Sequence, residues 1–140
     1  MRIERFGWRI QFLVGGPASA SERYAADCAA HIAHLRAKYP SCFWGDPSVF
    51  FTDGPLVNLG ADFGLMPSLF EPGGIVQHEF FVAGTPVIAF RTGGLKDTVH
   101  EFDRTSGEGC GFTFQAHTQG DFSYAVQRAV DVYRAGGGEL

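Results

Sequence analysis

The chain has 140 residues, a length typical of one domain, and its 45% hydrophobic and 19% charged residues are typical of a folded globular protein. This composition excludes a disordered tail, a coiled coil and a collagen-like fibre, and no apolar run reaches the roughly 18 to 20 residues that span a bilayer. The net charge of −4, with 11 basic residues scattered along the chain, argues against a nucleic-acid-binding surface.

Short apolar runs alternate along the chain with segments of helical periodicity. Strands are predicted at 9–14, 48–52, 63–67, 86–90 and 111–114. Helices are predicted from about residue 19 or 21 to 39, at 55–59 and 74–82, from about 94 to 100, and at 121–134. Strands separated by helices imply right-handed βαβ units, so we expect an α/β fold with a parallel sheet covered by helices on both faces.

Cellular compartment and metal binding follow from the cysteines and histidines. The three cysteines form no CxxC pair and their number is odd, which predicts the reduced thiols of an intracellular protein. We expect a cytoplasmic location, or a plastid one if a transit peptide precedes this sequence. Cys28, His31 and His34 share one predicted helix without the wider ligand set of a zinc site, so no metal site is expected. The segment 15–17 lacks the third glycine of GxGxxG, which disfavours a dinucleotide-binding dehydrogenase.

Ligands of parallel sheets bind beyond the carboxyl ends of the strands, which directs attention to Phe70-Glu71-Pro72-Gly73-Gly74. The free N–H groups where a helix begins can hold an anion or a hydroxyl-rich ligand. Glu79 follows Glu71 by eight residues, and two carboxylates in one crevice suit a glycosyl or ribosyl group. The alternative is that Glu71 is an ordinary residue of the first helical turn and Glu79 a solvated one; the spacing does not decide between the two.

A second candidate segment is Arg91-Thr92-Gly93-Gly94-Leu95, again between a strand and a helix. Glycines let the backbone approach a phosphate closely, and Arg91 and Lys96 would add fixed positive charge against a diphosphate. The alternative is an ordinary glycine-rich turn. One segment suits a phosphate and the other offers carboxylates to sugar hydroxyls. If both face one crevice, they indicate a nucleotide sugar as the ligand.

The segment 61–99, ADFGLMPSLFEPGGIVQHEFFVAGTPVIAFRTGGLKDTV, resembles the C-terminal domain of bacterial glycogen synthases and plant starch synthases. These are retaining glucosyltransferases of the GT-B fold, built from two Rossmann-like domains with the active site between them. The Glu-x7-Glu signature of retaining GT-B enzymes is present as Glu71 and Glu79, and RTGGLKDTV narrows the match to these synthases. GEGCGFTF at 107–114 is also similar to the starch synthase pattern, and the order of elements agrees from about residue 9 to 134.

The resemblance implies a role for each matching residue. Glu71 would bind the hydroxyls of the donor glucose and is the candidate catalytic residue. Gly73 and Gly74 would approach the glucose and the phosphates through the backbone, and Thr92, Gly93 and Gly94 would seat the diphosphate beside Arg91.

Two further residues would contact the nucleoside by the same resemblance. Glu79 would face the ribose or lie behind the residues that touch it, and Phe51 would stand where the family has an aromatic residue that stacks on the adenine. The implied reaction transfers glucose from ADP-glucose or UDP-glucose to the nonreducing end of an α-1,4-glucan. The nucleotide sugar is the substrate, and no cofactor is implied.

The sequence lacks the family's first domain and the Arg and Lys pair that opens its C-terminal domain; it starts at about that domain's second strand. We therefore expect residues 1–140 to form a single, incomplete Rossmann-like domain that is inactive alone and needs the missing domain, or another protein chain, as its partner. The alternative is a catalytically inactive half-domain that serves as a scaffold or regulatory subunit. A sucrose-type or lipid-linked GT-B glycosyltransferase is disfavoured by RTGGL and DTV.

Overall fold

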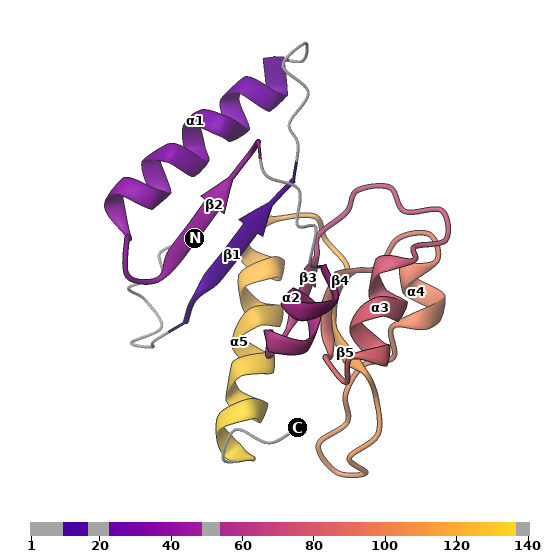
Figure 1. The fold of residues 1–140 in the computed structure, drawn as a ribbon. Coiled ribbons are helices and arrows are strands. Elements are labelled where there is room, and N and C mark those ends of the chain that lie inside the picture. Colours follow the sequence, from indigo (N-terminus) through magenta and orange to yellow (C-terminus); the bar gives the residue numbers. More distant parts are fainter. Residues whose placement is uncertain (1–9, 17–22, 49–53, 137–140) are drawn as a thin grey trace. The chain divides into compact units, whose positions relative to one another are not determined.

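The structure is a computed structural model that describes residues 10–16, 23–48 and 54–136 (Figure 1). The chain divides into two compact units, Arg2–Gly54 and Pro55–Leu140. Within the described ranges, no helix has the length and apolar character needed to cross a membrane.

The N-terminal unit is a strand–helix–strand motif. It consists of β1 (Phe12–Gly15), α1 (Arg23–Lys38) and β2 (Phe43–Asp46), and the two strands pair in parallel. Ile32 of α1 packs on β2 at Gly45, where a Cβ atom would lie 2.8 Å from the Ile32 side chain. The helix ends just before Pro40, which cannot continue it.

The second strand lies earlier than the sequence predicted. A strand at 48–52 was expected, but β2 is Phe43–Asp46 and Ser48 lies in the turn after it; residues 49–52 lie outside the described ranges. Glycine and aspartate are poor strand formers, so local propensity disfavours the segment FWGD. Pairing with β1 and packing against α1 outweigh that preference.

The C-terminal unit is a three-stranded parallel sheet with helices on both faces. Its strands are β3 (Gly64–Met66), β4 (Val87–Phe90) and β5 (Gly111–Phe114), in the spatial order β3-β4-β5. Its helices are α2 (Gly54–Gly60), α3 (Val76–Val82), α4 (Leu95–Thr98) and α5 (Gln119–Ala135). The predicted parallel α/β organisation is confirmed, and the strands that the structure describes form two parallel sheets.

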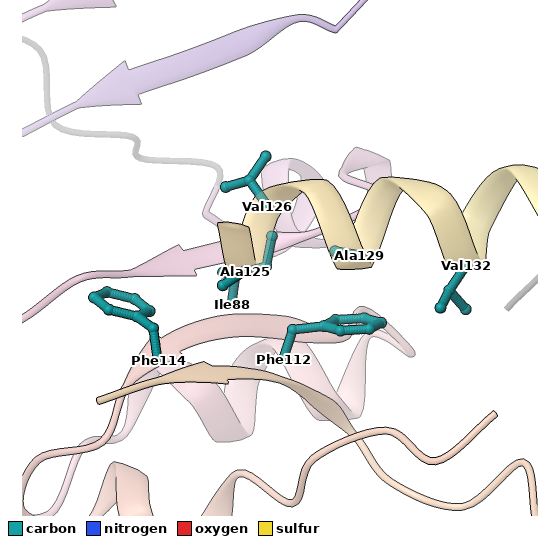
Figure 2. Close-up of a cluster of buried hydrophobic side chains, with 7 residues drawn as sticks. All are labelled: Ile88, Phe112, Phe114, Ala125, Val126, Ala129 and Val132. Carbon is teal, nitrogen blue, oxygen red and sulfur yellow. The ribbon is translucent and has the colours of Figure 1, made fainter. Parts of the chain in front are cut away.

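Side chains of β4 alternate between the two faces of this sheet. Ile88 joins the cluster beneath α5, whereas Val87 and Ala89 join the cluster beneath α3 and α4. Figure 2 shows the first cluster, which consists of Ile88, Phe112, Phe114, Ala125, Val126, Ala129 and Val132. The second contains Met66, Val87, Ala89, Leu95 and Val99, with Phe80 and Phe81 packed against it. This core holds the carboxyl ends of β3 and β4 side by side.

Candidate functional site

The two glycine-rich segments singled out from the sequence lie against each other in the C-terminal unit. The first follows β3 and the second follows β4, and these strands are parallel neighbours. The backbone N–H of Gly94 donates to the carbonyl oxygen of Glu71 over 3.0 Å. The hydroxyl of Thr92 donates to the carbonyl oxygen of Leu69 over 3.2 Å. We call residues 69–75 the first turn and residues 91–95 the second turn.

Glycine is required at two positions of the second turn. Gly93 has a φ of +44°, which L side chains rarely adopt, and a Cβ there would overlap the carbonyl group of Glu71. A Cβ on Gly94 would overlap the carbonyl group of Gly73. The two backbones are therefore in direct contact, which explains why two consecutive glycines occur here.

Behind the two turns lies Gln77 of α3, a residue that the sequence analysis did not single out. Its side chain is fully buried, at 0% exposure. Its Nε2 lies 3.0 Å from the carbonyl oxygens of both Gly73 and Gly74, and 3.3 Å from Oγ1 of Thr98 on α4. Thr98 Oγ1 in turn donates to the carbonyl oxygen of Gly94 over 2.8 Å. A buried amide thus connects the first turn to the second.

The outward side of the two turns presents backbone groups without side chains. Gly73 and Gly93 are exposed, and Glu71 is half-buried. Within the described part of the chain, the N–H groups of Gly73, Gly74 and Gly93 have no hydrogen-bond partner. Because α4 has only four residues, these individual N–H groups, rather than a long helix dipole, supply the local positive potential. Such an arrangement can accept a phosphate or a sugar hydroxyl.

An open pocket of about 370 Å³ adjoins the second turn and is lined by Arg91, Lys96 and Gln115. Arg91 follows β4 and Gln115 follows β5, so the pocket lies at the carboxyl ends of the strands. The sequence predicted a binding role for the two positively charged residues of this pocket, Arg91 and Lys96. It gave no signal for Gln115, because that residue enters only through the pairing of β5 with β4.

Of the two residues expected to contact the nucleoside, one lies in the described part of the chain. Glu79 lies on α3 and is exposed, and in the described part of the chain no hydrogen bond or ion pair links it to Glu71. Phe51 lies outside the described residues. The candidate site therefore consists of the first turn, which contains Glu71, and the second turn, which contains Arg91.

Similar proteins of known family identify the family of this chain. Residues 53–133 match the family of glycosyl transferases group 1. Glycogen synthase from Desulfitobacterium hafniense is 51% identical over 75 residues, and glycogen synthase from Bacillus cereus (strain B4264) is 46% identical over 77 residues. These matches cover 54% and 55% of this chain but only 16% of each relative.

Two solved structures have a similar fold. The catalytic domain of Starch Synthase IV from Arabidopsis thaliana, bound to ADP and acarbose, has a TM-score of 0.64 and 24% identity, and the match covers 90% of this chain and 32% of that one. Sucrose-phosphate synthase from Thermosynechococcus elongatus has a TM-score of 0.65 and 24% identity, and covers 86% of this chain and 29% of that one. The likeness confirms a Rossmann-like GT-B fold. The chain belongs to the glycosyl transferases group 1 family, and its sequence is similar to part of the glycogen synthases.

Proposed function

We propose that this chain is the donor-binding part of a retaining glucosyltransferase that transfers glucose from ADP-glucose or UDP-glucose to an α-1,4-glucan. The observation that carries the proposal is the contact between the two turns, where three glycine N–H groups near Glu71 and Arg91 have no partner among the described residues. Support also comes from the glycogen synthase relatives and from a starch synthase neighbour whose structure holds ADP and acarbose.

Each element of the site has a part in this proposal. The N–H of Gly93 in the second turn and the Arg91 guanidinium hold the diphosphate, and Gly73 and Gly74 let the donor approach the backbone. The Glu71 carboxylate accepts hydrogen bonds from glucose hydroxyls. As the bond between glucose C1 and the diphosphate oxygen breaks, negative charge grows on the leaving diphosphate, and fixed donors stabilise it without reorganising. The chain thus contributes leaving-group stabilisation and donor positioning.

The chain spans about one sixth of the length of its glycogen synthase relatives, at 16% of each. We infer that transfer needs the other GT-B domain, supplied by the same protein or by a partner chain, because it would hold the acceptor glucan. The described chain is then expected to bind a nucleoside diphosphate without turning over a sugar nucleotide.

The substitution Gly73→Ala tests the proposal without disturbing the fold. Gly73 is exposed, its φ is not positive, and a Cβ there meets nothing within 4 Å, so the folded chain can accept the methyl group. That methyl group would stand where the donor has to approach the backbone. We expect ADP affinity, measured by calorimetry, to fall about tenfold or more, which is a loss of at least about 1.4 kcal/mol.

Gly60→Ala is the matched control, because Gly60 is also exposed and open, and lies on α2. It should leave ADP affinity unchanged. Equal affinities for the two variants would contradict the proposed site. If the unsubstituted chain binds neither ADP nor UDP but forms a stable complex with another chain, the inactive scaffold becomes the better account.

A further inference from the structure

Gln77 is a buried polar side chain on α3. This helix packs on the face of the sheet whose buried apolar cluster contains Met66, Val87 and Leu95. Two carbonyl oxygens, of Gly73 and Gly74, lie 3.0 Å from its Nε2 atom. Two acceptors at this distance fix the orientation of the carboxamide, because only the nitrogen can donate to them.

The amide at this position carries an energetic cost as well as a gain. The Gln77 Oε1 atom is buried and has no hydrogen-bond partner among the described residues. An unpartnered buried acceptor costs about 1–3 kcal/mol, which offsets much of what the donor bonds contribute. An apolar side chain of similar size would avoid that cost but would leave the carbonyls of Gly73 and Gly74 without this donor. The amide is better explained by the geometry that it imposes on the first turn.

The imposed geometry follows from the planarity of the peptide bond. The peptide bonds of this region are trans, so each carbonyl points opposite to the N–H of the next residue. With the carbonyls of Gly73 and Gly74 held toward Gln77, the N–H groups of Gly74 and Ile75 point away from it. Neither N–H has a partner in the described part of the chain.

We propose that Gln77 is a positioning residue for the donor site. Its carboxamide turns the first turn's carbonyls inward and its N–H groups outward, and the link through Thr98 to the Gly94 carbonyl holds the second turn in register. The inference rests on the proposed function. In it, Gln77 keeps the donor site preorganised and does not itself contact the donor.

The test compares Gln77→Met with Gln127→Met. Met has a similar size but cannot donate, and Gln127 makes its bond to Asp131 on α5, so it serves as the control. Two readouts are measured: hydrogen exchange of the Gly94 N–H, which is bonded to Glu71, and ADP affinity. For Gln77→Met we expect Gly94 exchange to quicken and ADP affinity to fall, each about tenfold, while the amides of β4 keep their protection and Gln127→Met changes neither.

A second variant keeps the test independent of packing. In Gln77→Glu the ionised carboxylate faces two carbonyls and cannot donate, whereas its protonated form regains one O–H donor. The amide chemical shifts of Gly74 and Gly94 should therefore return toward those of the unsubstituted chain as the pH falls, a reversal that a purely structural defect would not show.

The outcomes separate the two proposals. Unchanged Gly94 exchange and ADP affinity in Gln77→Met, or shifts in Gln77→Glu that do not respond to pH, would overturn the positioning role. If the unsubstituted chain binds no nucleotide but Gly94 exchange quickens in Gln77→Met, Gln77 still positions the turns and the donor-site proposal is the one that fails.

Discussion

The N–H of Gly94 donates a 3.0 Å hydrogen bond to the carbonyl oxygen of Glu71 and so joins the loops that follow two neighbouring strands. Neither residue uses its side chain for this contact. The Glu71 carboxylate remains available to a ligand, and the glycine brings the backbones close. The candidate site is therefore built mainly from backbone, and substitutions that add atoms to it should be the most informative.

Gly93→Ala should destabilise the C-terminal unit. Its φ of +44° strains any L side chain, at a cost of about 1–3 kcal/mol, and the added Cβ overlaps the Glu71 carbonyl, which cannot move without breaking its bond to Gly94. The total loss in the free energy of unfolding, measured with urea, should exceed that for Gly84→Ala. Gly84 has a φ of +77° but open space around it, so this control reports the backbone strain alone. Equal losses would show that the turns are not in contact.

Most of the fold could be predicted because its elements follow local rules. The strands at β3, β4 and β5 are short apolar runs bounded by glycine and proline, and each lies within a residue or two of its prediction. Helix α5 begins two residues before the predicted 121, after Thr118, whose side chain accepts from the N–H of Asp121. The strand β2 was missed because its pairing with β1, rather than its composition, makes it a strand.

The site could be predicted only in part. Glycine pairs after strands are a local signal, and they located both turns. Gln77 gave no such signal, because apolar periodicity favours burying Ile75 and Val76, yet these two are 75% and 48% exposed while Gln77 is fully buried. Gln77 is buried in place of these apolar residues because its amide bonds to the carbonyls of Gly73 and Gly74. These carbonyls come into position only when the sheet has formed.

Leu95→Ala should cost about 2–5 kcal/mol in the free energy of unfolding, because Leu95 is fully buried beneath the second turn and its loss leaves a cavity. Leu56→Ala is the matched control on α2, where the side chain is 67% exposed, and it should change stability by less than about 0.5 kcal/mol. A similar effect of both substitutions, measured by urea unfolding, would contradict the packing described for this face of the sheet.

The edge of β5 that faces away from β4 contacts the charged residues Glu101 and Arg128. Glu101 accepts from the N–H and the hydroxyl of Thr113, both over 2.7 Å, and also pairs with Arg128, which donates to the Thr113 carbonyl over 2.6 Å. Glu101→Ala should cost about 1–2 kcal/mol and quicken exchange of the Thr113 N–H, whereas Glu101→Gln keeps an acceptor and should cost less. Unchanged Thr113 exchange in Glu101→Ala would show that the edge does not depend on this carboxylate.

The phenol of Tyr133 should titrate above its ordinary pKa of 10.0. Its hydrogen bond to Asp62, and then the negative charge of that carboxylate, favour the protonated phenol and raise its pKa. Because the folded pKa is raised, the associated stability is present below pH 10.0 and is lost as the pH rises through the folded pKa. Asp62→Asn should lower the titration midpoint, followed by NMR of the Tyr133 ring, while Asp131→Asn on α5 should not. Equal midpoints in the two variants would exclude the bond to Asp62.

An NMR titration with ADP tests the central claim most directly. The account predicts saturable shifts of the Gly73, Gly74, Gly93 and Gly94 amides, smaller shifts with AMP because it lacks the second phosphate, and loss of the response in Gly73→Ala. An absence of saturable shifts at these amides with millimolar ADP and UDP, in a chain that is otherwise folded, would contradict the claim that the two turns form a donor site.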